Sequence, residues 1–419
     1  MAQLSSDCFS AGMALLRLDA ALDDLAARLG AVAAPEEVAL GAACGRVLAD
    51  DVVAPAAVPG FDNSAVDGYA VRHADLAGAG ETRLPISVRI PAGTRGVAPL
   101  APGSAARIFT GAMMPPGADT VFMQEDVRVE GDHVRLPPGL APGANRRFAG
   151  EDFAAGAVAL RAGTRLRPQH VAALAALGLG RVHVRRPLRV GLFSTGDEVV
   201  EPGSGPLPPG AQFDSNRPML AGLLAARGME PVDLGILPDN RDAIARALAA
   251  AAERCEALVT SGGVSTGEED HVKAAVEAAG RLNFWRLAIK PGRPIAMGTI
   301  AGRPFLGMPG NPAAVFVTFT RFVGPVLDLL AGAAPVRPMP VPAVAGFAYR
   351  KKAERREYVR VSLVRDAERG VIARLFPRDG AALVSSLTES DGFVELGEEC
   401  LAVAPGDAVG YLPFAALLA

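Results

Sequence analysis

Between residues 187 and 332, short apolar runs alternate with segments of helical periodicity, and this alternation constrains the fold more than any other feature of the sequence. The runs at 189–194, 232–236 and 257–260 are continuous and apolar, which predicts buried strands. Helices are predicted at 216–227, 241–254 and 271–280. A chain that alternates in this way folds as a doubly wound parallel sheet, and ligands of such sheets bind beyond the carboxyl ends of the strands.

The loop after the third predicted strand is rich in glycine and hydroxyl groups. Residues 258–270 read Leu-Val-Thr-Ser-Gly-Gly-Val-Ser-Thr-Gly-Glu-Glu-Asp. Free N–H groups around Ser261, Gly262, Gly263 and Ser265 suit a phosphate or another oxyanion. Asp270, at the end of the loop, can cap the following helix or hold a divalent metal. A plain tight turn explains the same residues, so this loop alone leaves both interpretations open.

Five further loops should open on the same edge of the sheet, at 195–198, 214–216, 238–240, 290–294 and 308–312. Prolines such as Pro309 and Pro312 fix the shape of these loops. The acids expected at the edge are Glu198, Asp239 and Asp270, and the cations are Lys290, Arg293 and Arg286. Mixed charges fit a metal-bridged polyphosphate or oxyanion better than an apolar ligand.

Outside this segment, the sequence predicts three further units of a multidomain α/β protein. Short alternating strands separated by Pro/Gly turns predict a small β domain at 55–149, inserted into an N-terminal helical region of 1–54 and 150–186. That helical region should contain helices at 11–29 and 169–179 and a shorter amphipathic segment at 36–51. After a Pro/Ala-rich linker, strand alternation predicts a C-terminal β barrel or sandwich within 333–419.

Several polar residues of the two β units are ambiguous when each is considered alone. Asp62, Asn63, Ser64 and Asp67 form either a turn before a strand or a cluster of functional oxygens. Thr110 begins a long loop of the inserted domain. Arg360 and Ser386, in the C-terminal unit, are expected at the surface on the same grounds.

Composition excludes several classes of protein. The formal charge of −3 and the pI near 6.0 provide no general basic field, so nucleic-acid binding is not expected. The four cysteines lie far apart, which argues against a zinc site and a disulfide framework and favours the cytoplasm. No signal peptide is expected at the N-terminus. The apolar segment 313–336 is interrupted by Arg321, Pro325 and Asp328, which favours a buried helix over a membrane span.

Taken together, the loops resemble the molybdopterin molybdenumtransferase family, bacterial enzymes related to the second catalytic domain of gephyrin. The matching motifs are Pro-Gly-Phe-Asp-Asn-Ser at 59–64, Asp-Gly-Tyr-Ala at 67–70, Thr-Gly-Ala at 110–112, Ser-Thr-Gly-Asp-Glu at 194–198, Thr-Ser-Gly-Gly-Val-Ser at 260–265, Ile-Lys-Pro-Gly-Arg-Pro at 289–294 and Gly-Met-Pro-Gly-Asn-Pro at 307–312. Val66 departs from the methionine usual in the family.

The resemblance implies an elongated homodimer whose α/β domain is built like the molybdopterin adenylyltransferases. It implies an active cleft between the α/β domain of one subunit and the inserted domain of the other, to which Asp67 and Thr110 would contribute. The implied reaction takes adenylylated molybdopterin and molybdate, releases AMP and requires Mg²⁺, for which Glu198, Asp239 and Asp270 are the candidate ligands. Lys290, Arg293 and Arg286 would attract molybdate and the phosphates, with weaker support for Arg360 and Ser386. No membrane partner is expected.

Two alternatives remain. A molybdopterin adenylyltransferase would have a similar α/β domain, but it would need neither the insertion nor the C-terminal β unit. A non-catalytic scaffold, a role that gephyrin also has, would not need acids and cations in each cleft loop.

Overall fold

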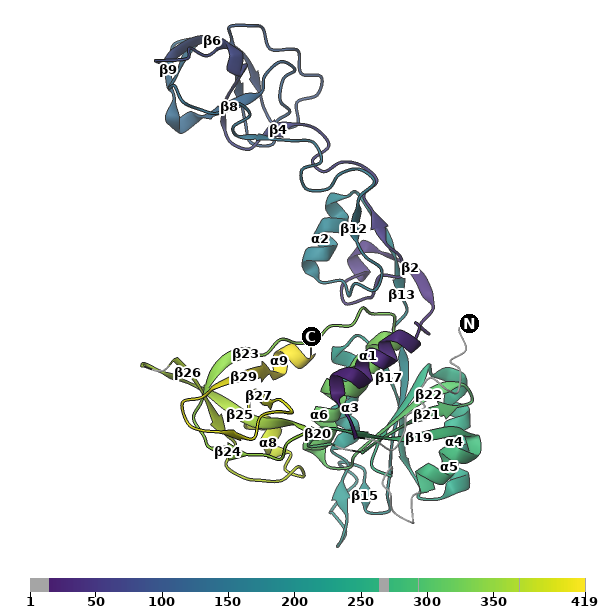
Figure 1. Cartoon of the computed structure of the whole chain (residues 1–419). Helices are drawn as coiled ribbons and strands as arrows, with labels where there is room; N and C mark the ends of the chain where they lie inside the picture. Colours follow the sequence, from purple (N-terminus) through teal and green to yellow (C-terminus); the bar gives the residue numbers. More distant parts are fainter. Residues whose placement is uncertain (1–14, 264–270, 293, 369, 419) are drawn as a thin grey trace.

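The computed structural model describes residues 15–263, 271–292, 294–368 and 370–418. Figure 1 shows an elongated molecule, with the inserted β domain at one end and the central sheet and C-terminal β unit at the other. Three predicted site residues, Ser265, Asp270 and Arg293, lie outside the described residues.

Seven strands form the central sheet, in the order β1-β19-β21-β22-β18-β14-β17. Their bounds are Leu15–Leu16 (β1), Arg189–Thr195 (β14), Glu230–Leu237 (β17), Ala257–Ser261 (β18), Gly280–Leu287 (β19), Pro294–Ile300 (β21) and Arg303–Met308 (β22). β17, β14, β18 and β22 are parallel, as predicted. β21 is antiparallel to both of its neighbours. Only Ala301 and Gly302 separate β21 from β22, and two residues suffice for a hairpin but not for a parallel crossover.

Helices cover both faces of this sheet, which confirms the doubly wound arrangement. Their bounds are Leu18–Arg28 (α1), Asn216–Ala226 (α3), Arg241–Arg254 (α4), His271–Ala279 (α5), Pro312–Thr318 (α6) and Gly324–Leu330 (α7). α1, α3, α6 and α7 share one hydrophobic core with Val259 of β18, whereas α4 and α5 share another with Leu258. The two faces thus follow the alternation of side chains along β18.

The apolar segment predicted to be a buried helix forms α6, a π-helical turn at Phe319–Val323 and α7. Within the described part of the chain, Pro312–Leu330 is the one helix long and apolar enough to cross a membrane, with a mean hydropathy of 1.6. Inside the protein, 83% of its most apolar window is buried. We therefore assign it as a core helix.

The N-terminal region contains fewer helical residues than its periodicity predicts. α2 (Pro168–Ala176) agrees with the helix predicted at 169–179. α1 agrees with the later part of the helix predicted at 11–29, but Leu15–Leu16 form β1 instead and pair in parallel with β19. The segment at 36–51 does not form a helix: β2 (Pro35–Ala39) pairs antiparallel with β13 (Arg181–Arg185), and a 3-10 turn follows at Leu40–Ala42. β3 (Val52–Val53) pairs in the same way with β12 (Val158–Leu160).

The inserted domain is a six-stranded sheet in the order β8-β5-β7-β6-β10-β9. The bounds are Gly68–Val71 (β5), Thr82–Ile90 (β6), Ala105–Ile108 (β7), Thr120–Met123 (β8), Arg128–Glu130 (β9) and His133–Leu136 (β10). Beside it, β4 (Asn63–Ser64) pairs with β11 (Arg146–Arg147), and short 3-10 turns lie at His73–Asp75 and Gln124–Asp126. Two clusters of buried side chains form its own core.

The C-terminal unit is a closed five-stranded barrel, in the cyclic order β25-β26-β23-β29-β27. The bounds are Val341–Ala345 (β23), Arg356–Asp366 (β25), Gly370–Leu375 (β26), Gly392–Leu396 (β27) and Ala408–Pro413 (β29), with Tyr349–Arg350 (β24) paired to Ala402–Val403 (β28) and short helices at Ser385–Thr388 (α8) and Phe414–Leu418 (α9). A two-residue strand, β20 (Ile289–Lys290), leaves the central sheet and pairs in parallel with β25.

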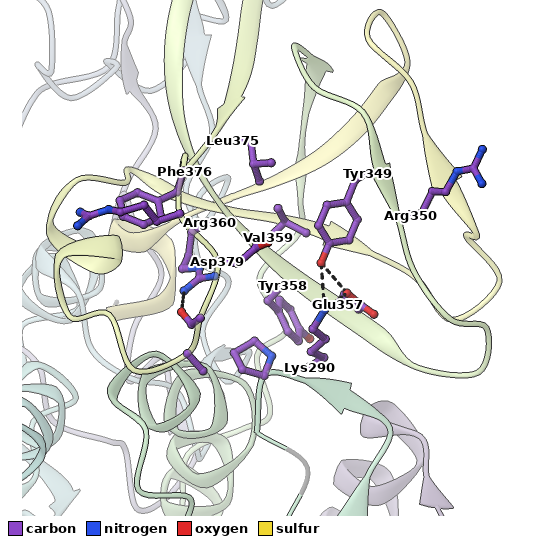
Figure 2. A pocket seen from close by; sticks show the side chains of 14 residues that line it. Lys290, Tyr349, Arg350, Glu357, Tyr358, Val359, Arg360, Leu375, Phe376 and Asp379 are labelled. Carbon is purple, nitrogen blue, oxygen red and sulfur yellow. Dashed lines mark hydrogen bonds and ion pairs between the residues drawn. The ribbon is translucent and has the colours of Figure 1, made fainter.

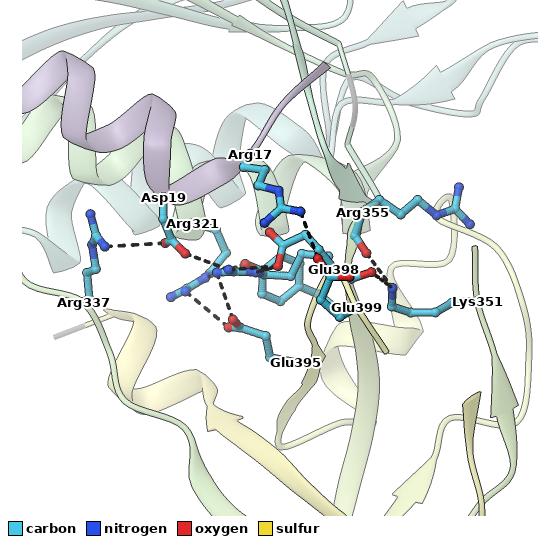
Figure 3. A network of polar contacts seen from close by, with 11 residues as sticks. Arg17, Asp19, Arg321, Arg337, Lys351, Arg355, Glu395, Glu398 and Glu399 are labelled. Carbon is cyan, nitrogen blue, oxygen red and sulfur yellow. Dashed lines mark hydrogen bonds and ion pairs between the residues drawn. The ribbon is translucent and has the colours of Figure 1, made fainter. Parts of the chain in front are cut away.

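A buried polar network attaches this barrel to α1 and to the core helix. Arg356 contacts Asp19 at 2.7 Å, Glu395 at 3.1 Å and Glu398 at 3.2 Å. Arg321, from the core helix, contacts Glu395 at 3.3 Å. Figure 3 shows these acids converging between the two units. Because the charges are paired, the network can lie at a buried junction without leaving an isolated charge.

Candidate functional site

A small cavity of about 80 Å³ lies at the carboxyl edge of the central sheet. It contains four predicted site residues, Glu198, Ser261, Gly262 and Pro312. The other lining residues come from the end of β14, from β15 (Val199–Val200) and β16 (Gln212–Phe213), from the start of α3 and from the loop after β22: Ser194, Thr195, Val199, Gln212, Phe213, Asp214, Ser215, Asn216 and Gly310. Loops that are distant in the sequence thus meet where the parallel strands end. We call this the sheet-edge cavity.

The glycines after β18 allow the backbone to pass close to this cavity. Gly262 and Gly263 have φ angles of +81° and +62°, a region that favours glycine. A Cβ atom on Gly263 would lie 2.7 Å from Thr195 Oγ1 and from Val272 Cγ2. The Gly262 N–H donates to the carbonyl of Met308 at 3.0 Å. The loop is therefore both tight and attached to the loop after β22.

Two buried oxygens of the sheet-edge cavity have no hydrogen-bond partner among the described residues. They are Ser194 Oγ and Asn216 Oδ1. The amide nitrogen of Asn216 donates to Gly310 O at 2.6 Å, so the side chain is held while its oxygen stays available. Buried polar groups in native proteins are usually paired. These two oxygens therefore suit a ligand or ordered water that hydrogen-bonds in the cavity.

The carboxylates of this cavity have different environments. Asp214 is buried and contacts the guanidinium of Arg217 at 3.0 Å. Glu198 is exposed, and no ion pair involves it within the described residues. Asp214 is thus neutralised by a structural partner, whereas Glu198 is available to a cation.

Among the described residues, no group of three or more His, Cys, Asp or Glu side chains lies close enough together to hold a metal ion by itself. Mg²⁺ often binds through one or two carboxylates while water and substrate phosphates complete its coordination. The carboxylate of Glu198 beside unpaired hydroxyl and amide oxygens fits that kind of site.

A second and larger cavity, of about 430 Å³, lies where β20 meets the barrel (Figure 2). Its lining residues are Lys290, Pro291, Tyr349, Arg350, Glu357, Tyr358, Val359, Arg360, Leu375, Phe376, Arg378, Asp379, Gly380 and Ala381. Four cations and two carboxylates thus border it, which favours an anionic ligand. We call this the barrel cavity.

Lys290 is held in the barrel cavity by the barrel itself. Its ammonium lies 3.3 Å from Tyr349 OH and 3.3 Å from Glu357 Oε2. Burial lowers the pKa of Lys290, but Tyr349 and Glu357 together raise that pKa above its ordinary value. The side chain therefore stays an ammonium at neutral pH.

Arg360 forms the opposite cationic group of the barrel cavity. Its Nη1 donates to Gly380 O at 2.6 Å and to Ser386 Oγ at 3.1 Å, while its Nε is buried without a partner among the described residues. Burial lowers the pKa of Arg360, because the charged form is incompletely solvated. An anion in the cavity would compensate this guanidinium. Ser386 is fully buried, and it contacts Arg360 without lining the cavity.

The start of α6 separates the two cavities. Pro312 lines the sheet-edge cavity, and the next residue, Ala313, donates its N–H to the carbonyl of Ala381, which lines the barrel cavity, at 3.0 Å. The structure thus divides the loops that we expected at one edge. Lys290 is displaced from the other loops because its strand, β20, pairs with the barrel.

Asp67 and Thr110 contact each other in the inserted domain. Asp67 Oδ1 accepts hydrogen bonds from the Thr110 N–H and hydroxyl, both at 2.8 Å. These hydrogen bonds hold the pKa of Asp67 below its ordinary value. The inserted domain, which contains the pair, lies at the opposite end of the molecule from the central sheet (Figure 1). Near this pair, Ser64 Oγ donates a hydrogen bond to the carbonyl of Val66, so Ser64 stabilises a turn. Asp62 contacts Arg146, so Asp62 has a structural partner.

Seven of the described predicted residues line neither cavity: Asp67, Thr110, Gly263 and Ser386, whose positions are given above, and Asp239, Arg286 and Pro309. Asp239 follows β17 and is half-buried, Arg286 is an exposed residue of β19, and Pro309 follows β22 beside Gly310.

Tyr349, Glu357, Ser194 and Asn216 are among the polar cavity residues that were not predicted as site residues from the sequence. Ser194 begins one of the motifs and Asn216 begins a predicted helix, so position relative to the strand ends could have identified both. Glu357 and Tyr349 do not follow a strand of the central sheet, so their position gives no such signal. An acid in a strand-forming segment, such as Glu357, is also usually exposed.

Comparison with known proteins relates these cavities to a family. Residues 16–178 match the MoeA N-terminal region (domain I and II), residues 191–329 a probable molybdopterin binding domain, and residues 342–414 the MoeA C-terminal region (domain IV). A molybdopterin molybdenumtransferase of Haemophilus influenzae is 38% identical over 411 residues, covering 96% of this chain and 100% of the relative. One from Nostoc sp. is 42% identical over 306 residues, covering 71% and 70%.

A solved structure has the same architecture. The molybdopterin biosynthesis moeA protein from Pyrococcus horikoshii superposes with a TM-score of 0.78 at 33% identity, covering 95% of this chain and 99% of that chain. Similarity of this extent, over all parts of the molecule and in the order of the motifs, shows that the chain belongs to the molybdopterin molybdenumtransferase family.

Proposed function

We propose that this protein inserts molybdenum from molybdate into adenylylated molybdopterin, with release of AMP, as a step of molybdenum cofactor biosynthesis. The observation that carries the proposal is the division of the site into two cavities on either side of the start of α6. One cavity offers a carboxylate, serine hydroxyls and a glycine-lined backbone, and the other offers cations that keep N–H donors for a ligand within the described residues. A reaction between a nucleotide-linked phosphate and a separate oxyanion needs both environments.

The sheet-edge cavity would receive the phosphoanhydride that joins AMP to the pterin. The Ser194 and Ser261 hydroxyls would donate to its oxygens, Gly262 would let the loop approach them closely, and the tight backbone at Gly263 would keep these groups fixed. Cleavage of a phosphoanhydride depends more on positioning and charge stabilisation than on covalent catalysis. Among the described cavity residues no Ser/His nucleophile pair is found, in agreement with this chemistry.

Mg²⁺ is part of the proposal. Glu198 would hold it, and Asp270 is a further predicted ligand. Asp239, in the loop after β17, would orient water. When bound, the ion would neutralise the charge that develops on the phosphate oxygens. Glu198 and the unpaired Ser194 and Asn216 oxygens support this assignment.

The barrel cavity would receive molybdate, a tetrahedral dianion. The Lys290 ammonium and the Arg360 guanidinium lie on its walls. The Nε–H of Arg360 has no hydrogen-bond acceptor among the described residues, so it can donate to the anion. Ser386 would hold Arg360 in place. Arg293 and Arg286 remain predicted contributors.

The proposed active unit is a cytoplasmic homodimer. Asp67 and Thr110 belong to the inserted domain, which lies at the opposite end of the molecule from the central sheet (Figure 1), so they would complete the cleft of a partner subunit. The two alternatives are less well supported. The named relatives are molybdenumtransferases, and an adenylyltransferase or a scaffold would have no use for the cations of the barrel cavity.

The test is molybdate-dependent release of AMP from adenylylated molybdopterin. Lys290→Ala should raise the molybdate concentration needed for half-maximal release by about 10- to 100-fold, because it removes a charged hydrogen-bond donor. Lys352→Ala, at an exposed lysine of the barrel, is the matched control and should behave as the wild type. Transfer of AMP from ATP to molybdopterin, without molybdate dependence, would contradict the proposal.

A further inference from the structure

We propose that Glu357 and Tyr349 are positioning residues, which together aim the Lys290 ammonium at the anion in the barrel cavity. This inference rests on the proposed function, since it assumes that the anion is the molybdate of that reaction. Neither residue belongs to the motifs from which the site was predicted. Their role follows from how three side chains from three strands meet (Figure 2).

The contacts account for two of the three N–H bonds of Lys290. An ammonium has three donors and no acceptor. One faces Tyr349 OH and another Glu357 Oε2, each at 3.3 Å, and Tyr349 OH in turn donates to Glu357 Oε2 at 2.8 Å. This triangle selects one orientation of a side chain that would otherwise rotate freely. The third donor remains for a ligand in the cavity.

Glu357 does not cancel the positive charge that the anion requires. Only 1% of its side chain is exposed, and its other oxygen, Oε1, accepts from Arg355 at 2.6 to 2.7 Å. Two cations and one carboxylate therefore leave one net positive charge. Because Arg355 already compensates the buried acid, Glu357 can orient Lys290 without neutralising it, and the exposed end of the cluster is the ammonium.

The backbone brings the parts into register. β20 pairs in parallel with β25, and Lys290 lies directly opposite Glu357 in this pairing. β24 supplies Tyr349, which also presents its ring to the ammonium at 5.8 Å. Lys290 is thus attached to the wall of the barrel at both its backbone and its side chain, as a preorganised binding group should be.

The decisive experiment is a double-mutant cycle with Tyr349→Phe and Lys290→Ala. Tyr349→Phe keeps the ring and removes only the hydroxyl. We expect it to weaken molybdate binding, measured by titration calorimetry and by the KM for molybdate, about three- to tenfold, with kcat nearly unchanged. In the Lys290→Ala background, the same substitution should have no further effect, because Tyr349 acts through Lys290. Tyr411→Phe, at a buried tyrosine of the same barrel, is the matched control.

The second measurement is the pH dependence of molybdate binding, with Glu357→Gln. Besides Tyr349 and Glu357, the charged groups that face the cavity are Arg350, Arg360, Arg378 and Asp379. Loss of the carboxylate removes the group that favours the charged lysine, so binding should be lost at a lower pH on the alkaline side than in the wild type. Far-UV circular dichroism would show whether Glu357→Gln is folded. If it is not folded, Tyr349→Phe takes its place in the measurement of the pH dependence.

The outcomes separate this inference from the proposed function. If the wild type shows no molybdate-dependent AMP release, the proposed function fails. If Lys290→Ala weakens molybdate binding but Tyr349→Phe does not, the function stands and the positioning role is wrong. A Tyr349→Phe effect that persists in the Lys290→Ala background would also overturn the role, since it would show that the tyrosine acts elsewhere in the barrel.

Discussion

Gly263 lies in a loop that has no space for even one additional carbon atom. A Cβ atom there would lie 2.7 Å from two side chains, in a backbone with φ +62°. We expect Gly263→Ala to lower the free energy of unfolding by about 1 to 3 kcal/mol and to reduce AMP release by displacing Thr195 and the loop. Gly235→Ala is the control. It has φ +76° but no described atom within 4 Å of the new Cβ, so it measures backbone strain alone in a urea titration. Equal losses in the two variants would show that the close approach is unimportant.

At this scale, sequence reasoning found residues at strand ends and missed residues buried by distant pairing. Glu198, Ser261 and Gly262 follow strands that apolar runs predict, and they meet in one cavity. The contribution of Glu357 depends on its register with Lys290, 67 positions earlier, which local pattern does not encode. The roles of all the predicted site residues stay predictions, including those of Asp239, Asp270, Arg286 and Arg293.

At the scale of elements, a buried guanidinium joins three segments of the α/β domain. Arg217, in the first turn of α3, contacts Asp214 at 3.0 Å and also pairs with Glu201 and Asp233. Arg217→Met should lower the free energy of unfolding by about 3 to 5 kcal/mol, because Asp214 would stay buried without its partner. Arg189→Met is the control, because its pair with Glu256 lies partly at the surface and should contribute at most about 1 kcal/mol. Similar losses in thermal unfolding would contradict this difference.

Periodicity predicted most elements of the α/β and β units, because each has a clear buried face. α4, for example, was predicted at its observed bounds. The segment at 36–51 was predicted wrongly as amphipathic and helix-like. Its first part alternates between exposed and half-buried residues and is stabilised by pairing with residues 181–185, which lie more than 140 positions later. Tertiary pairing of this kind overrides a weak local preference.

At the scale of the whole molecule, the buried hydrophobic side chains form several clusters, including one inside the barrel and one in the N-terminal region. One core includes α1, the central sheet and barrel residues such as Phe393 and Leu412, whereas the inserted domain has cores of its own. We expect two transitions in differential scanning calorimetry. Val134→Ala should lower the free energy of unfolding of the inserted domain alone, by about 2 kcal/mol, and Leu412→Ala that of the unit formed by the sheet and the barrel alone. A third, separate barrel transition would contradict the shared core.

The proposed dimer makes a prediction at the same scale. Asp67→Ala and Glu198→Ala should each abolish AMP release, because each removes one side of the proposed cleft. If the cleft joins two subunits, refolding the variants together should restore roughly a quarter of the wild-type activity, since half of the dimers would be mixed and each would have one intact site. The individually refolded variants are the controls. Absence of recovery, with mixed dimers demonstrated by mass spectrometry, would place both residues in the same subunit's site.

The two residues of β20 have a mechanical consequence. Because Lys290 is hydrogen-bonded into the barrel wall while Glu198 stays with the central sheet, a rotation of the barrel would carry the ammonium with it and leave the carboxylate behind. The distance between the two charges is therefore set by how the barrel is seated, and the salt bridges of Arg356 to Asp19 and of Arg321 to Glu395 contribute to that seating from outside the two cavities.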